Sequence, residues 1–236
     1  MLIVVVTLSM AVTPLLVSLC ARITTRPPRD TPPYDAFDGE APRVIIAGFG
    51  RIGQIVARVL RANHIAFTAI EHSIEQVEVS RRFGSKIHFG DPARAELLRS
   101  ANIEKAEVLV IATDNPDTNI RIARLVRRQY PHVKVFARAR NRQHVFRLMD
   151  MDVEVVRETF HSSLVLSREV LTALGLDPDV AGQRVQRFRE YDEKLLAAQH
   201  LVYDDETAIM QSTRDALVDL DHLFEADSAQ DEGANP

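Results

Sequence analysis

Residues 43–54 read RVIIAGFGRIGQ, and this stretch decides the fold. Its first half is rich in β-branched residues, which favour a buried strand. The glycines within residues 48–53 end that strand, and apolar side chains then recur at helical spacing up to residue 60. A GxGxxG motif between a strand and a helix is typical of a nucleotide site, because glycine permits a tight turn, close approach of a pyrophosphate and close helix–strand packing. The helix N-terminus would face the phosphates, and the residues predicted to form this nucleotide site are Gly48, Gly50, Arg51, Ile52 and Gly53.

A second apolar run, residues 65–70, ends at Glu71. In dinucleotide-binding folds an acidic residue about 20 positions beyond the glycines accepts hydrogen bonds from ribose hydroxyls. Such a carboxylate would repel the 2′-phosphate of NADP(H), so Glu71 favours NAD(H) or an adenosine nucleotide. His72 and Arg82 weaken that preference, and an ordinary acid at a strand end is the alternative interpretation.

Strands and helices continue to alternate along the chain. Further strands are predicted at residues 86–89, 107–112, 132–137 and 153–156, and helices at 94–100, 116–129 and 142–149. Regular alternation implies an α/β fold, specifically a Rossmann-like doubly wound parallel sheet with right-handed crossovers.

Polar residues gather at the carboxyl ends of these strands, where ligands bind in open α/β sheets. Gly48 and Glu71 follow the first two strands, and Asp91, Thr113 and Asp114 follow two others. We predict that all five contact the nucleotide. Asp91 and Asp114 are equally suited to cap helices, since Asp is a preferred N-cap residue, and that interpretation stays open for each.

The net charge of −4 over 236 residues conceals regions of different character. Residues 1–20 contain no charged side chain, and we predict a transmembrane helix over residues 1–21. The arginines that follow it mark the next segment as cytoplasmic, whereas a signal peptide would carry its positive charge before the apolar stretch. A buried soluble helix is the other alternative. Residues 22–42 are rich in proline and predict a linker.

The C-terminal part is helical and acidic. After the α/β domain, predicted over residues 43–159, residues 160–226 form a helical extension, and residues 227–236 are predicted to be a disordered tail. A helix pair that projects from a compact domain often packs on a second copy, so we expect a dimer. Residues 190–236 carry a net charge of −11, which opposes binding to a nucleic-acid backbone.

The sequence shows no motif typical of a catalytic site. Cys20 is the only cysteine, which excludes a disulfide scaffold, and no metal-ligand spacing or nucleophile motif follows residue 157. We therefore expect no enzyme activity and no metal site. Arg138, Arg140 and Arg142 form a basic cluster, and their convergence with arginines at other strand–helix junctions would suit an anionic ligand.

Several segments together resemble one known family. RVIIAGFGRIGQ, KIHFGDPARAELLRSA, PHVKVFARAR and RETF are similar to the cytoplasmic regulatory domain (RCK/KTN, or TrkA-N) of Kef-type glutathione-gated potassium–proton antiporters. SMAVTPLL and the proline-rich linker resemble the end of that family's membrane domain. The resemblance covers nearly the whole chain and weakens after about residue 200. GFGRxGQ alone would indicate only the broader superfamily of potassium-transport regulators.

The resemblance implies a dimeric gate that controls potassium efflux from the cytoplasmic face of the bacterial inner membrane. It implies AMP or NAD(H) in the glycine-loop site, glutathione or its adducts between subunits, and no nucleic acid. Its implied partners are the antiporter membrane domain and an ancillary flavin quinone reductase. Two alternatives remain: a nucleotide-sensing module of another potassium channel or transporter, and a soluble NAD-dependent oxidoreductase.

The resemblance also implies the glutathione contacts. Arg58 matches an arginine of the family on the first helix, and Phe83 an aromatic residue displaced by bulky adducts. Arg157 of RETF matches an arginine that reaches glutathione from the other subunit. Asp192 stands where much of the family has an asparagine, and a carboxylate cannot donate the hydrogen bonds of an amide.

Overall fold

The computed structural model describes residues 10, 12–13, 41–82 and 87–233, with side chains described up to residue 220. The predicted membrane span 1–21 and the linker therefore lie almost entirely outside the described residues, as does Phe83. Within the described part of the chain, no helix is long and apolar enough to cross a membrane. The fold belongs to the compact unit Asp35–Pro236.

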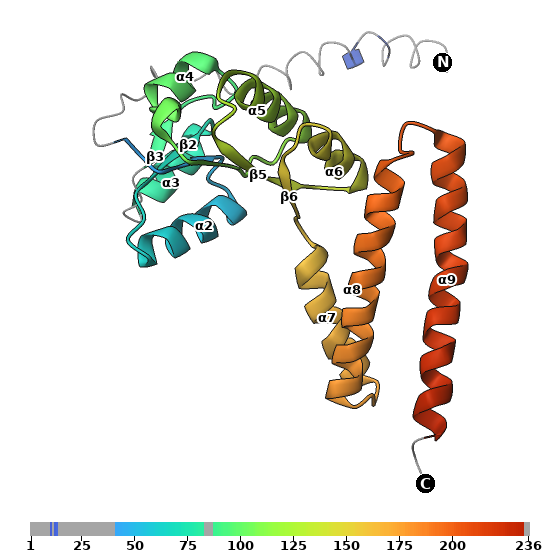
Figure 1. Ribbon diagram of the computed structural model, residues 1–236. Helices are drawn as coiled ribbons and strands as arrows, with labels where there is room; N and C mark the ends of the chain where they lie inside the picture. Colours follow the sequence, from blue (N-terminus) through green and yellow to red (C-terminus); the bar gives the residue numbers. More distant parts are fainter. Residues whose placement is uncertain (1–9, 11, 14–40, 83–86, 234–236) are drawn as a thin grey trace, which may run out of the picture. The chain divides into compact units, whose positions relative to one another are not determined.

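Six parallel strands form one sheet in the order β3-β2-β1-β4-β5-β6 (Figure 1). This is the strand order of a doubly wound Rossmann-like fold, as predicted, with the chain reversing direction across the sheet between β1 and β4. The strands are β1 (Val44–Ala47), β2 (Phe67–Glu71), β3 (Ile87–Phe89), β4 (Val108–Ile111), β5 (Lys134–Ala139) and β6 (Glu154–Arg157).

Helices cover both faces of the sheet (Figure 1). They are α2 (Arg51–Ala62), α3 (Ile74–Arg82), α4 (Ala95–Ser100), α5 (Pro116–Gln129) and α6 (Arg142–Met149), with a short 3-10 turn, η1 (Ile103–Lys105). Alternate residues of β1 point to opposite faces: Ile46 packs in the cluster beneath α2 and α3, and Ile45 in the larger cluster with α4, α5 and α6. Burial on both faces explains the continuous apolar run in β1.

The face beneath α2 is covered unevenly. On this side of the sheet, Val108 and Val110 of β4 are only partly buried, and Val156 of β6 is exposed. The alternate residues of β4, Leu109 and Ile111, point to the opposite face and are fully buried. An apolar half-face is thus left open next to α2.

Three long helices follow the sheet: α7 (Phe160–Ala173), α8 (Pro178–His200) and α9 (Glu206–Gly233). α7 and α8 lie side by side as a helical hairpin (Figure 1). No residue of α7 is buried, and its exposed side chains include Val165, Leu166 and Val170; Leu174, just after the helix, is also exposed. α8 begins at Pro178 after Asp177, whose carboxylate accepts the N–H groups of Asp179 and Val180.

The structure moves several predicted boundaries, and three of the shifts have a clear cause or consequence. β2 starts at Phe67 because the Ile65 N–H still donates to the Leu60 carbonyl (3.0 Å) at the end of α2. β5 continues to Ala139, so Arg138 lies within a strand instead of following it. α9 continues to Gly233, beyond the predicted end at residue 226, because no glycine or proline interrupts the chain before that glycine.

Candidate functional site

The glycine loop between β1 and α2 is shaped by two close backbone approaches. Gly48 has φ +98°, and a Cβ there would lie 2.6 Å from the backbone nitrogen of Thr113. A Cβ at Gly53 would lie 2.2 Å from the carbonyl oxygen of Gly48. Only glycine fits at either position. Gly50, by contrast, has open space around it and leaves the start of α2 without a side-chain cap.

Glu71 holds this loop from the end of β2. Its buried carboxylate accepts the N–H of Phe49 (2.7 Å) and of Ser73 (2.9 Å), and His72 Nδ1 lies 3.0 Å from the same carboxylate. Burial favours the neutral form, but the hydrogen bonds from His72, Phe49 and Ser73 outweigh it and lower the pKa of Glu71. The Glu71 carboxylate in turn raises the pKa of His72. We call Gly48, Gly53 and Glu71 the glycine rim; contact of Glu71 with a ribose stays a prediction.

The other predicted nucleotide residues stand farther along the same edge. Asp91 Oδ1 accepts the N–H of Ala93 (2.9 Å) in the turn before α4, whose N-cap residue is Arg94. The exposed Asp114 precedes Asn115, which is the N-cap of α5. Neither Asp therefore caps a helix, and that alternative is wrong for both.

Thr113, which follows β4, is held by a buried hydrogen-bond network. Its hydroxyl is hydrogen-bonded to the side-chain oxygen of Asn119, and the Asn119 amide also donates to the carbonyl of Arg138 (3.3 Å). Both Thr113 and Asn119 are buried. The part of Thr113 nearest the glycine loop is its backbone nitrogen, which faces Gly48.

Arg138 joins the ends of three strands. Its side chain is only 6% exposed, and it donates from Nη1 to Asp114 and from Nη2 to Glu158, both at 2.5 Å. Glu158 also accepts from Nη2 of Arg51, at the start of α2 (3.2 Å). The prediction that Arg138 faces a ligand groove with the other arginines is therefore wrong, because its place inside β5 directs it into this ion-pair network.

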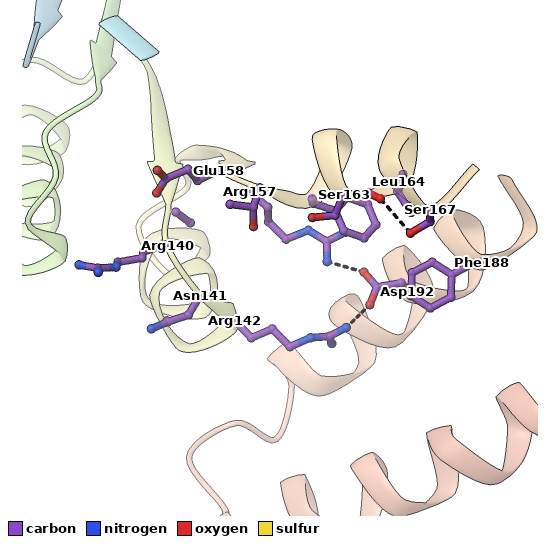
Figure 2. A pocket seen from close by; sticks show the side chains of 13 residues that line it. Arg140, Asn141, Arg142, Arg157, Glu158, Ser163, Leu164, Ser167, Phe188 and Asp192 are labelled. Atoms are coloured by element: carbon purple, nitrogen blue, oxygen red, sulfur yellow. Dashed lines mark hydrogen bonds and ion pairs between the residues drawn. The ribbon is translucent and has the colours of Figure 1, made fainter. Parts of the chain in front are cut away.

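A second site lies beyond β6, between α6, α7 and α8 (Figure 2). It is a pocket of about 420 Å³. At its centre the buried carboxylate of Asp192 on α8 lies between two guanidinium groups, Arg142 of α6 and Arg157 of β6. We call Arg142, Arg157 and Asp192 the arginine pocket. Two cations thus share the carboxylate of Asp192, which leaves the pocket attractive to another carboxylate.

The walls of the arginine pocket fix both cations. Arg142 also donates to the side-chain oxygen of Gln199 (2.7 Å). The guanidinium of Arg157 stacks over the Phe160 ring, with its central carbon 3.3 Å from the ring centroid. Apolar side chains complete the lining, among them Leu164 and Phe188.

Polar contacts hold the end of α8 to α6 next to this pocket. His200 Nε2 lies 2.8 Å from Oδ1 of Asp150, and the Tyr203 hydroxyl is hydrogen-bonded to Oδ2. The hydrogen bond to Asp150 raises the pKa of Tyr203 to about 12, and the Tyr203 hydroxyl lowers the pKa of Asp150. Phe146 packs against the Tyr203 ring, with centroids 5.3 Å apart. The wall formed by α8 is therefore anchored at its C-terminal end.

Of the four residues expected to bind glutathione, the structure brings Arg157 and Asp192 together. Arg58 is exposed on α2 and does not line the arginine pocket. The basic cluster contributes Arg140 and Arg142 to the lining, so the expected convergence of arginines holds for part of the cluster. Gln199 was missed, since nothing in the sequence singles out one glutamine late in a helix.

No group of three His, Cys, Asp or Glu side chains is placed to hold a metal ion in the part of the chain that the structure describes.

Two family models match the chain. The TrkA-N domain matches residues 44–158, and the potassium efflux system KefB C-terminal domain matches residues 162–236. The glutathione-regulated potassium-efflux system protein KefC of Escherichia coli O139:H28 is 39% identical over 204 residues, which are 86% of this chain and 33% of that protein. The chain thus spans about a third of the length of the curated relatives it matches.

Two solved structures are similar to the chain. The Kef CTD of Shewanella denitrificans, in an AMP-bound form, is 37% identical with a TM-score of 0.62, over 67% of this chain and 98% of that one. The TrkA-N domain of the Escherichia coli inner membrane protein ybaL is 23% identical with a TM-score of 0.50, over 55% of this chain and 96% of that one. At that identity, the second likeness supports the fold alone.

Proposed function

The chain belongs to the family of Kef C-terminal regulatory domains, and we propose that it is the ligand-sensing gate of a potassium:proton antiporter. The observation that carries the proposal is the arginine pocket, in which Arg142 and Arg157 share the single carboxylate of Asp192. The relatives support it, because KefC is by name a glutathione-regulated potassium-efflux system protein and the second family model is the C-terminal domain of such a system.

A nucleotide occupies the glycine rim in this proposal. AMP is the first candidate, because the Shewanella denitrificans domain is described in an AMP-bound form, and NAD(H) is the second. The loop leaves an open approach at Gly50, where the phosphate would meet the N-terminus of α2. The residues that would hold the nucleotide are Gly48, Gly50, Arg51, Ile52, Gly53, Glu71, Asp91, Thr113 and Asp114.

Glutathione or a glutathione adduct occupies the arginine pocket. The tripeptide has two carboxylates, which suit bidentate pairing with Arg142 and Arg157. Asp192, already held by both, orients the two guanidinium groups and competes with the ligand's carboxylates for them. A substituent on the ligand sulfur would find the apolar wall formed by Leu164 and Phe188.

A second copy of the chain completes the site. Arg58 lies on α2 between Ile55 and Val59, whose side chains are exposed. α7 likewise presents large apolar side chains and has no buried residue. Dimerisation would cover such surfaces and would bring Arg58 towards the pocket of the partner.

The antiporter membrane domain is the proposed partner, and the chain would act at the cytoplasmic face of a bacterial inner membrane. Gating then requires a ligand that binds two arrangements of the dimer with different affinities, because equal affinity shifts no equilibrium. A flavin quinone reductase as an additional partner stays a prediction.

Calorimetric titration of the full chain with glutathione and with S-hexylglutathione tests the ligand assignment. Arg157→Ala removes a charged partner of the ligand, so we expect at least about a 10-fold loss of affinity. Arg124→Ala is the matched control, since Arg124 is exposed on α5 and lies outside the pocket lining. If Arg157→Ala binds either ligand as the unaltered chain does, the arginine pocket is not the glutathione site.

A further inference from the structure

The end of β6 touches both candidate sites. Arg157, the last residue of β6, reaches Asp192 in the arginine pocket. Glu158, the next residue, points the opposite way, towards the carboxyl edge of the sheet (Figure 2). Two consecutive residues therefore serve two sites, and Glu158 also belongs to the lining of the arginine pocket.

Glu158 is connected to the nucleotide residues by two arginines. Its side chain is 15% exposed and accepts from Arg138 (2.5 Å) and from Arg51 (3.2 Å). Arg51 directly follows Gly50 in the glycine loop, and Arg138 holds Asp114 with its other nitrogen (2.5 Å). Both connections end on residues that the proposed function assigns to the nucleotide.

We propose that Glu158 couples the two sites, so that a nucleotide at the glycine loop and an anionic ligand in the arginine pocket weaken each other's binding. This inference rests on the proposed function, which supplies the two ligands. It adds the sign of their interaction and the residue that transmits it.

The sign follows from the charges. Arg51 is 86% exposed, so its guanidinium is free to turn from Glu158 to a phosphate placed at the N-terminus of α2. Glu158 then keeps Arg138 alone, and Arg138 is shared with Asp114. The carboxylate of Glu158 becomes less neutralised at the wall of the arginine pocket and opposes the ligand's carboxylates. Linkage makes the effect reciprocal.

The test compares the dissociation constant of S-hexylglutathione for the full chain with and without saturating AMP. We expect AMP to raise this constant about 5-fold, at the low end of ordinary coupling between sites. Glu158→Gln keeps an oxygen that accepts from Arg138 but removes the charge, so the ratio of the two constants should fall to about 1. The ratio is informative even if Glu158→Gln alters either affinity by itself.

Two further variants test whether the effect is specific to Glu158. Glu107→Gln is the matched control and should keep the 5-fold ratio. Glu107 pairs with Arg43 (2.7 Å) at the amino ends of β4 and β1, away from both candidate sites. Arg51→Gln removes the exposed end of the connection and leaves the buried Arg138 in place, so it should abolish the coupling without threatening the fold.

The outcomes separate this inference from the proposed function. If the unaltered chain binds neither ligand, both are wrong. If it binds each ligand alone and the ratio is 1, only the coupling is wrong. If the ratio persists in Glu158→Gln and in Arg51→Gln, the sites communicate by another route and Glu158 is not the residue that couples them.

Discussion

The glycine rim and the arginine pocket lie at neighbouring parts of one domain but are held by different interactions. In the glycine rim the contacts involve main-chain atoms. Gly48 and Gly53 pack against the main chain, and Glu71 accepts hydrogen bonds from main-chain N–H groups. In the arginine pocket the contacts are between the ends of long side chains from separate elements, Arg142 and Arg157 on Asp192.

This difference assigns different behaviour to the two sites. Main-chain packing offers no alternative arrangement, so the glycine rim is pre-organised for its ligand. Arginine side chains lose considerable rotamer entropy when held and exchange one carboxylate for another without moving the backbone. We therefore expect substitutions in the glycine rim to destabilise the fold. Substitutions in the arginine pocket should instead change which ion pairs form and how tightly the ligand binds.

The largest effect is expected for Gly53→Ala. A Cβ placed 2.2 Å from the Gly48 carbonyl cannot be accommodated without moving α2 from the sheet. We expect the free energy of unfolding to fall by about 3 kcal/mol, at the upper end of the range for overpacking. Nucleotide affinity should be lost with it. Chemical denaturation and calorimetric titration with AMP measure the two effects.

Gly50→Ala is the matched control for that substitution. Nothing lies within 4 Å of a Cβ at Gly50, and its φ of −73° suits any residue. Its stability should change by less than about 1 kcal/mol, while nucleotide affinity should still fall because the open approach is narrowed. Equal stability loss in the two variants would contradict the assigned roles of these glycines.

The same contrast explains what could be predicted from the sequence. The fold and the edge that carries Gly48, Glu71, Thr113 and Asp114 follow from local patterns: strand–helix alternation, and glycines where the backbone needs them. The buried direction of Arg138 was missed because it depends on where β5 ends, and strand ends are poorly defined by local pattern.

The arginine pocket was harder to predict for a physical reason. Arg142 and Arg157 meet Asp192 across 50 and 35 residues of sequence, so their contact depends on how α8 packs against the α/β domain. Resemblance to a family singled out Arg157 and Asp192. Arg142 entered only as one of a basic cluster, since spacing alone does not say which arginine turns inward.

A smaller effect, of opposite sign, is expected at the pocket for Asp192→Asn. The substitution keeps the shape but removes the anion that Arg142 and Arg157 share. Both guanidinium groups then become available to a carboxylate of the ligand, so glutathione affinity should rise about 10-fold, or 1.4 kcal/mol. The ligand-free chain should become less stable by about 1 kcal/mol, because α8 loses charged hydrogen bonds to α6 and β6.

Asp179→Asn, an exposed change on the same helix, should leave glutathione affinity unchanged. A loss of affinity in Asp192→Asn would mean that the carboxylate contacts the ligand's ammonium group directly and matters more to binding than its competition for the arginines. Thermal unfolding with and without glutathione separates the effect on binding from the effect on stability.

The smallest effect is expected for the titration of His72 beside the glycine rim. The Glu71 carboxylate raises the pKa of His72 above its ordinary value of 6.5, so their interaction stabilises the fold fully below pH 6.5 and is lost as the pH rises through the higher folded value. The lowered pKa of Glu71 makes its own contribution fully present above pH 4.5 and lost as the pH falls through the lower folded value. The pair therefore stabilises the rim most between pH 4.5 and 6.5.

His72→Gln separates this contribution from the rest of the rim. The side chain of His72 is 72% exposed, so water and salt screen its charge and the change in stability should be small. The glutamine variant should lose the decline in stability above pH 6.5 and keep the decline at acid pH, because Phe49 and Ser73 still donate to Glu71. Thermal unfolding measured from pH 2 to 9 checks both parts. If the variant also loses its acid dependence, Glu71 is held mainly by the imidazole, and the rim depends on exchangeable side-chain contacts just as the arginine pocket does.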